Sequence, residues 1–429
     1  MNSSITRTLL GLTGIGLAFS LNSHGDEALQ QRLADLEAKV ASLEQNDAQS
    51  LRGAWRNGFI FEQPDKAFRL RVGGRMQMDT AFFSADEALD EAKGPFDDGI
   101  KFRRARLFLS GTLYDNFEFL TEYDFAGGTQ FRTLYMGVKN IPVIGNVRAG
   151  HLLEPFGLEE FSSNNHLTLM ERGGPTIFSP VRNSGLMVFN HQLEERMTWA
   201  AGVFKDTGNF GDSVSNEEFA VTARLTGLPY LANEDRNYLH VGYNMSYRNL
   251  NEEGFRARAR PDSFVAPYVT DTKNLTADSV TLASLEAMLN LGPLTLQSEW
   301  GMAGLSGHKD EDGVGQPQPE FTAYYVMAAY RLTGEHKPYN RKNGTFLGIR
   351  PNQNVTGKSW GKGAWELAAR YNSVDLMDKN VEGGEMEAVT FGLNWYLNPN
   401  SRVMFNYVMA DVKDIGDVDV YQMRFQFDF

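Results

Sequence analysis

The feature that most constrains this chain is an alternation of polar and apolar residues that begins at Phe68 and recurs as far as Phe429. The stretch FRLRVGGRMQMD, which starts at Phe68, carries most of its apolar residues on one parity and its arginines on the other. The final residues, YQMRFQFDF, alternate in the same way and end on an aromatic side chain. A period of two predicts β-strands with one apolar face and one polar face.

By this pattern sixteen segments are expected to be strands. They cover residues 68–83, 101–113, 117–125, 131–139, 145–151, 184–191, 196–205, 217–226, 238–248, 279–291, 293–303, 320–332, 362–373, 385–397, 400–411 and 418–429. Tight turns such as Asp115–Asn116 alternate with long loops such as 84–100 and 249–278. This arrangement is typical of bacterial outer-membrane barrels. One connection, 333–361, falls on the short-turn side and yet is long.

A soluble β-sandwich also buries one face of each strand, so a single strand does not separate it from a membrane barrel. The N-terminus favours the barrel, because residues 1–25 contain Arg7, an apolar run and small residues before Asp26, as a cleavable secretory signal peptide does. In lipid every strand edge must be paired, so the sheet must close around a bore. We therefore predict an all-β, 16-stranded antiparallel transmembrane β-barrel over residues 68–429, in contact with the lipid of a bacterial outer membrane.

Two segments separate the signal peptide from the expected barrel. Residues 26–50 carry apolar residues at alternating spacings of four and three, namely Leu29, Leu33, Leu36, Val40 and Leu43. This spacing predicts a short coiled-coil helix, which either packs on its own protein or associates with copies of itself. Residues 51–67 are expected to be a linker.

The net charge of −13 and the absence of cysteine narrow the classes of function. An acidic chain is a poor match for nucleic acid, and without cysteine no disulfide or thiolate metal site forms. We expect neither a metal nor an organic cofactor.

The segment 150–182 interrupts the strand pattern. It has no period of two and is punctuated by prolines and glycines. Loops of this length are uncommon and usually functional. The segment also mixes apolar anchors with polar groups, so we expect it to pack inside the barrel; the alternative is a long surface loop.

The polar parity of the expected strands should line the bore. Its arginines are Arg69, Arg71, Arg75, Arg104, Arg106, Arg148, Arg224, Arg370 and Arg424. Carboxylates on the same parity, such as Asp79 and Glu122, are expected to form some salt bridges with them. Arg103 and Arg104 are adjacent, so only one of them points straight inward from a regular strand, unless the strand end turns Arg103 inward.

The stretch FRARARP sets Arg256, Arg258 and Arg260 on one side of an extended chain, about 7 Å apart. Like charges at this spacing are tolerable when water or anions screen them. The stretch is therefore either a solvated face or a ladder that hands anions from one guanidinium to the next.

Several stretches together resemble the phosphate-selective porin O and P family. They are FRLRVGGRMQMD, KFRRARLFLSGT, FGLEEFSSNNHLTLMER, RARARP, YRLTGE, GAWELAARYNSV and FGLNWYLNPNSRVMFNYV. The resemblance implies a trimeric barrel whose third long loop folds inward to form the constriction, with an arginine ladder that leads to a central anion site. The matching positions are Arg75, Arg103, Arg104, Ser162, Ser163, Arg172, Arg258 and Arg260, and Arg256 is an addition of this sequence.

Two positions depart from the family pattern. Glu160 stands where phosphate-selective members carry a lysine, and Asp262 stands where they carry a further ladder arginine. Glu160 and Arg172 could also face each other across a fold of the loop. Tight phosphate selectivity therefore does not follow from the resemblance.

The function expected is passive diffusion of small anions, with phosphate or polyphosphate as candidate solutes. The alternatives are a weakly selective general porin, a mainly structural barrel and an outer-membrane barrel enzyme. No histidine lies in a recognisable nucleophile motif, so we expect no enzyme.

Overall fold

The computed structural model describes residues 30–42, 50–55, 58–215, 218–251, 254–310, 312–358 and 360–429. The expected signal peptide, residues 1–25, lies outside these ranges. Within the expected coiled-coil segment, residues 30–42 form an exposed helix. Among the described residues, no helix is both long and apolar enough to span a membrane.

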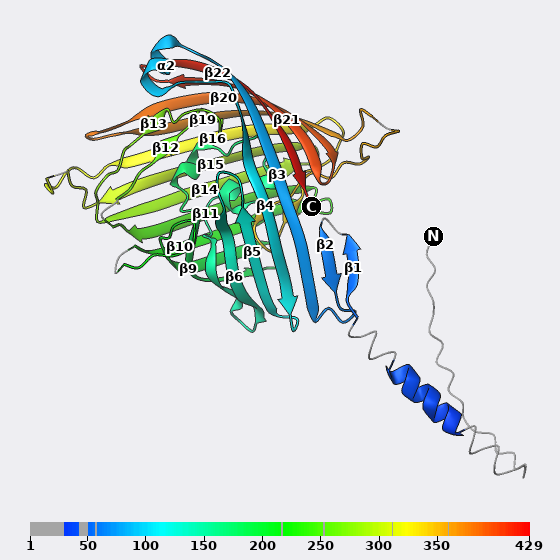
Figure 1. Ribbon diagram of the computed structural model, residues 1–429. Coiled ribbons are helices and arrows are strands. Elements are labelled where there is room, and N and C mark those ends of the chain that lie inside the picture. The colour runs from blue at the N-terminus through cyan, green and yellow to red at the C-terminus, as the bar shows by residue number, and fades with distance from the viewer. Residues whose placement is uncertain are drawn as a thin grey trace, which may run out of the picture. The chain divides into compact units, whose positions relative to one another are not determined.

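The described part of residues 68–429 forms a closed antiparallel barrel (Figure 1). The sheet has 18 strands, of which β1 and β2 lie outside the ring, leaving sixteen barrel strands. These are β3 (Phe68–Ala85), β4 (Gly99–Leu113), β5 (Phe117–Asp124), β6 (Gln130–Ile141), β7 (Gly145–Leu153), β8 (Arg182–Gln192), β9 (Met197–Lys205), β10 (Phe219–Ala232), β11 (Asn237–Asn249), β14 (Ser279–Leu291), β15 (Leu294–Ser306), β16 (Glu320–Arg331), β19 (Ala364–Asp378), β20 (Val381–Asn398), β21 (Ser401–Val412) and β22 (Gly416–Asp428). β22 pairs with β3 from Val418↔Ala85 to Asp428↔Arg75 and closes the ring. The prediction of a 16-stranded barrel is confirmed.

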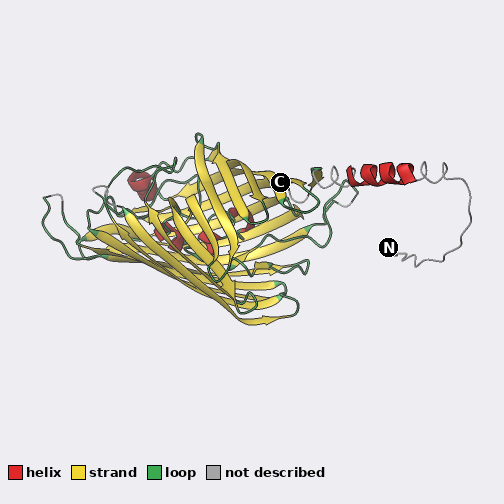
Figure 2. Ribbon diagram, turned by 90° about the horizontal axis from the view of Figure 1, so that it is seen from below, coloured by secondary structure: helices red, strands yellow, loops and turns green. Residues whose placement is uncertain are grey.

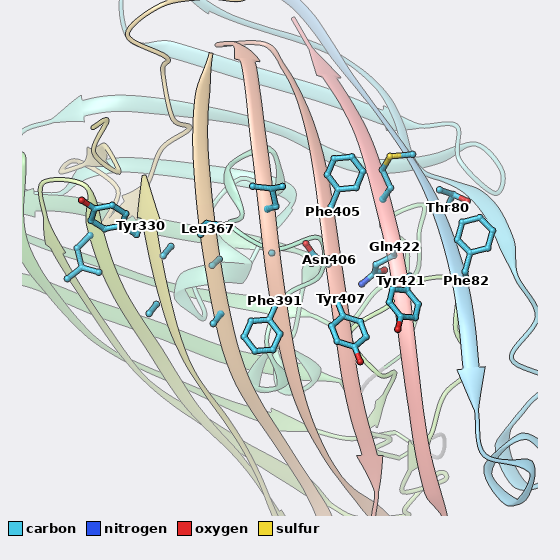
Figure 3. Close-up of a pocket in the computed structure, with 18 residues that line it drawn as sticks. Thr80, Phe82, Tyr330, Leu367, Phe391, Phe405, Asn406, Tyr407, Tyr421 and Gln422 are labelled. Atoms are coloured by element: carbon cyan, nitrogen blue, oxygen red, sulfur yellow. The ribbon is translucent and has the colours of Figure 1, made fainter. Parts of the chain in front are cut away.

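The two parities of the strands face opposite sides of the wall. On β21 and β22, Phe405 and Tyr421 are exposed, whereas their neighbours Asn406 and Gln422 are buried. Figure 3 shows the aromatic rings on one face of the strands and the two amides turned to the other. An apolar exterior with polar side chains inside is what a membrane barrel requires.

The segment 51–67 differs from the linker that the sequence suggested. β1 (Arg52–Trp55) and β2 (Phe59–Glu62) form a hairpin, and β2 pairs with β3 from Phe59↔Val72 to Glu62↔Arg69. β22 ends before it reaches these residues of β3, so the hairpin continues the wall beyond the C-terminus. The Trp55 ring stacks on the Phe429 ring with centroids 6.4 Å apart. β1 and β2 have only four residues each, so their alternation of polar and apolar side chains is too short to be recognised in the sequence.

The long loop between β7 and β8, here called the constriction loop (154–181), folds into the barrel as expected. It contains α3 (Leu158–Phe161), η1 (Asn164–His166) and η2 (Gly174–Phe178), and Figure 2 shows these short helical turns within the ring of strands. Leu158, Leu167 and Leu169 are each at most 1% exposed. A second long loop, here called the ladder loop (250–278), contains β12 (Arg258–Ala259) and β13 (Thr270–Asp271).

The connection 332–363 lies on the short-turn side. Its strands β17 (Tyr339–Asn340) and β18 (Thr345–Phe346) pair with each other. Lys337 Nζ donates a hydrogen bond of 2.6 Å to the carbonyl of His166 in the constriction loop. Phe346 packs with Leu158 and Leu167 in one buried cluster. This connection is long because it enters the barrel and supports the constriction loop.

Candidate anion site at the constriction

The constriction loop is fixed to the far wall by backbone groups. The Glu299 carboxylate of β15 accepts hydrogen bonds from the amides of Leu158 and Glu159, at 2.7 and 3.0 Å. At the other end of the loop, Gly173 lies so close to Tyr325 that a Cβ on it would stand 2.2 Å from the ring. Only glycine permits this approach, so the loop has a defined position across the bore.

On the wall opposite Glu299, Arg106 of β4 lies among the charged side chains that face the constriction loop. Its Nε lies 2.6 Å from the Asp124 carboxylate, and its Nη1 lies 3.6 Å from Glu122. Arg75 on β3 binds the same Glu122 at 3.0 Å and also donates to Asn164 of the constriction loop at 2.6 Å. These contacts hold a row of guanidinium groups against the loop.

Two β-bulges add arginines to this wall. In the β3–β4 ladder, Gln77 pairs with Arg104 and Met78 pairs with Phe102, so Arg103 is skipped. In the β5–β6 ladder, Glu122 pairs with Thr133 and Tyr123 pairs with Phe131, so Arg132 is skipped. A bulge changes where the side chains of a strand point. Both Arg103 and Arg104 therefore face the bore, which a regular strand forbids.

Arg132 and Arg182 belong to the constriction, although the sequence did not single them out. Arg132 interacts electrostatically with Arg106 and Glu160, and Arg182 interacts with Arg132 and Glu122. Arg182 also donates to Thr133 at 3.1 Å. Arg132 lies on the outward parity of its strand, and only the bulge turns it inward.

Arg104, Ser162 and Ser163 reach the constriction in different ways. Arg104 is buried and donates to Gln77 at 2.7 Å. Ser162 is also buried, and its hydroxyl has no hydrogen-bond partner within the described residues. Ser163 caps η1 by accepting a hydrogen bond from the amide of Asn165 at 3.4 Å, so its present role is local structure.

Arg172 clamps the constriction loop. Its Nε lies 3.1 Å from the Glu160 carboxylate and donates to the Glu159 carbonyl at 2.9 Å. The charge of Arg172 is thus partly neutralised by Glu160.

Glu171 joins the constriction loop to two strands. Arg103 donates to both of its carboxylate oxygens, at 3.0 and 3.1 Å, and Arg424 of β22 binds it at 2.8 Å. Burial alone raises the pKa of Glu171, but the charges of Arg103 and Arg424 outweigh it and hold that pKa well below its usual range. Glu171 is therefore ionised and occupies the donors of Arg103.

The ladder arginines divide into two kinds. Arg256 is bound by Asp271, with Nε 2.8 Å from the carboxylate. Arg258 and Arg260 make no ion pair with a carboxylate within the described residues, and their guanidinium carbons lie 4.0 and 4.1 Å from the centre of the Tyr268 ring. The intervening Ala257 and Ala259 are buried, so the arginine side of the strand faces the bore.

Asp262 does not face the bore as a free charge. Its carboxylate is bound by Arg370 at 2.7 Å, by Thr390 at 2.8 Å and by Asn372 at 3.0 Å. The residue that replaces a ladder arginine thus anchors the ladder loop to β19 and β20.

Comparison with known proteins places this arrangement in a family. A sequence model of phosphate-selective porin O and P matches residues 70–429. The chain belongs to the phosphate-selective porin O and P family. Porin O of Pseudomonas aeruginosa is 26% identical over 418 residues, which cover 87% of this chain and 91% of the relative. An uncharacterized protein of Caulobacter vibrioides is 25% identical over 410 residues, covering 87% of this chain and 76% of the relative.

Solved porins share the fold of this porin. An anion-selective porin from Comamonas acidovorans superposes with a TM-score of 0.54 at 13% identity, covering 84% of this chain and 100% of that one. The trimer form of OmpT, an outer membrane protein of Vibrio cholerae, gives 0.53 at 12% identity, covering 84% and 99%. Family and fold together make the chain a porin of the bacterial outer membrane, a channel rather than an enzyme.

Two cavities of this porin adjoin the described constriction loop. The outer cavity, about 220 Å³, lies under the ladder loop and is lined by Arg103, Arg172, Arg258 and Arg260. The inner cavity, about 800 Å³, adjoins the 332–363 connection and is lined by Arg75 and Ser163. Six of the nine anion-site residues inferred from sequence therefore line one cavity or the other, whereas Arg104, Ser162 and Arg256 line neither.

A further depression, about 800 Å³, lies on the outer wall and not in the bore. It is lined mainly by outward side chains of β15, β16, β19 to β22 and β3, such as Tyr330, Phe391 and Tyr407 (Figure 3). An apolar surface here is expected of a wall that faces lipid.

The part of the chain that the structure describes contains no group of three His, Asp or Glu side chains arranged to hold a metal ion.

Proposed function

We propose that this porin passes small anions through the constriction by passive diffusion, with phosphate among them. The observation that carries the proposal is an excess of arginine over carboxylate on the wall that faces the constriction loop. Within the described residues, Arg104, Arg132 and Arg182 make no ion pair with a carboxylate, so their charge is less neutralised than that of Arg106.

The charges around Arg106 favour the same solute. Arg75, Arg104, Arg106, Arg132 and Arg182 meet the carboxylates of Glu122 and Asp124, so the described wall has an excess of positive charge. Weak binding at several such places is what a conducting channel requires. The names of the relatives support the same proposal, since Porin O belongs to a phosphate-selective family and the Comamonas porin is described as anion-selective.

The selectivity proposed is moderate. Glu160 neutralises Arg172, Glu171 occupies Arg103, and Asp271 occupies Arg256. These pairings favour a second candidate, a weakly selective general porin. The reversal potential across a planar bilayer under a KCl gradient decides between the two. A potential that reports preference for chloride supports the anion porin, and one that reports no preference, or preference for potassium, contradicts it.

We propose that the assembly is a homotrimer, like the trimer form of OmpT. Outer-wall residues of β4 to β7, including Phe117 and Met136, form an exposed apolar depression of about 540 Å³, which is available for contact with a neighbouring copy. Light scattering corrected for detergent tests this proposal, and a monodisperse monomer would contradict it.

A further inference from the structure

The outer cavity contains a cluster of arginines packed on aromatic rings. The guanidinium carbons of Arg258 and Arg260 both lie over the Tyr268 ring, at 4.0 and 4.1 Å from its centre. Phe264 has Arg260 at 5.2 Å and Arg103 at 4.1 Å. The attraction between a cation and a ring face offsets part of the repulsion among these guanidinium groups.

The contacts of these arginines determine which hydrogen-bond donors remain available to a ligand. An anion binds a guanidinium group through its N–H donors. Arg103 donates the hydrogen bonds of its Nε and Nη2 to the Glu171 carboxylate. Arg260 gives one donor to the Phe264 carbonyl at 3.1 Å, and Arg258 makes no hydrogen bond within the described residues. The N–H donors of Arg258, and those of Arg260 that do not bind the Phe264 carbonyl, are therefore available to an anion.

The carboxylates in the lining of the outer cavity do not oppose an anion there. Glu171 is shared between Arg103 and Arg424, and Asp262 is held by Arg370. Each carboxylate is thus compensated by a guanidinium group outside the Arg258–Arg260 pair. The local field from that pair remains positive.

The rest of the lining combines apolar side chains with the polar side chains of Thr176, Ser263 and Asn372. Ile177 of η2 is half-buried and lines the cavity together with Val374 of β19 and Met386 of β20. The cavity holds about 220 Å³, whereas one water needs only about 10–15 Å³. An inorganic oxyanion would accept hydrogen bonds from the arginines but would leave the apolar side chains of the lining in contact with water. An anion with an apolar ring or short chain would bind the arginines and also cover these apolar side chains.

We propose that the outer cavity selects organic anions that carry an apolar group, in preference to inorganic or very small anions of the same charge. The head group binds the N–H donors of Arg258 and Arg260, and the apolar group lies against Ile177 and the ring edges of Phe264 and Tyr268. This inference rests on the proposed anion function and names the class of solute for the entry of the same pore.

The test compares benzenesulfonate with methanesulfonate as blockers of chloride current through the wild-type porin in a planar bilayer. Both carry the same head group and are fully ionised near neutral pH. We expect benzenesulfonate to reach half-block at a concentration about tenfold lower, because its ring loses apolar surface to the cavity. Equal block by the two anions in a channel that still prefers chloride to potassium overturns this inference alone. A preference for potassium overturns the proposed function as well.

Two variants locate the effect. Ile177→Thr should reduce the ratio between the two blockers to about threefold or less by removing apolar contact, and Ile177→Leu should restore it. Leu347→Thr is the matched control, since Leu347 is an exposed apolar residue that lines the inner cavity, and it should leave the ratio unchanged. An unchanged ratio in Ile177→Thr, or an equal loss in Leu347→Thr, places the preference outside the outer cavity and contradicts the assignment.

Discussion

The Glu160 carboxylate and the Arg172 guanidinium lie 3.1 Å apart within the constriction loop, although the chain separates them by twelve positions. Arg172 also donates to the carbonyls of Glu159 and Ser162. The guanidinium of Arg172 is therefore engaged by its own loop. We expect this pairing to weaken the binding of phosphate at the constriction.

Replacing Glu160 by lysine should strengthen the block of chloride current by phosphate. The change removes the partner of Arg172 and adds a second cation. Unit charges ~4 Å apart interact by about 4 kcal/mol at an effective dielectric constant near 20, and water in the pore reduces this. We expect roughly tenfold stronger block, measured as the phosphate concentration that halves the current. The control is Glu87→Lys, the same charge change on exposed α2 (Glu87–Lys93); similar effects of both variants would rule out a local role.

Arg258→Ala with Arg260→Ala should lower anion conductance mainly in dilute salt. We expect these arginines to concentrate anions at the pore entry through an electrostatic effect that reaches about 10 Å at 0.1 M salt and about 3 Å at 1 M. Conductance measured from 0.05 to 1 M KCl reports the difference. Arg256→Ala is the control, because Asp271 already neutralises Arg256, and its effect should be smaller. An equal loss for the double variant at all salt concentrations would indicate a structural role.

Arg132→Gln and Arg182→Gln should each reduce the preference for chloride over potassium, by roughly threefold. Within the described residues neither arginine makes a direct ion pair, and Glu122 and Glu160 act on both only electrostatically, so much of their charge acts on the solute. The reversal potential under a KCl gradient measures the change. Arg196→Gln removes the same charge from the exposed turn between β8 and β9 and should have no effect. Unchanged selectivity in both bore variants would show that the conducting path avoids them.

Lys337 should make stability depend on pH. Burial lowers the pKa of Lys337 to about 7, although the charge of Glu366 acts in the opposite direction. Between this value and the ordinary lysine pKa near 10.4, the unfolded chain holds the proton and the folded chain does not. Stability therefore rises with pH across that range. We expect the thermal unfolding temperature in detergent to increase from pH 7 to pH 10.

The increase should be absent in Lys337→Met and retained in Lys342→Met, since the Lys342 side chain is 64% exposed. The Lys337 variant also loses the hydrogen bond to the His166 carbonyl, so its unfolding temperature at pH 10 should lie below that of wild type. A wild-type curve that is flat from pH 7 to pH 10 would show that Lys337 keeps its proton in the folded state.

The sequence by itself determined the barrel and its sidedness. Alternation at period two depends only on the local backbone, so all sixteen strands from Phe68 onward could be read from side-chain parity. The interruption of that parity at 150–182 predicted a long loop, and its mixture of apolar anchors with polar groups favoured packing inside the barrel over a surface loop. The arginines of FRARARP could be placed on one side of an extended chain for the same reason.

Only the tertiary structure decided which charges act in the bore. Bulges at Arg103 and Arg132 reversed the direction that parity assigns to a side chain, and a bulge depends on the register of the neighbouring strand. Asp262 is bound by Arg370, which lies 108 residues away in the chain. A pattern of neighbouring residues in the sequence cannot predict a partner at that distance. The sequence gives the number of arginines, but the closed barrel decides which carboxylates lie close enough to neutralise them.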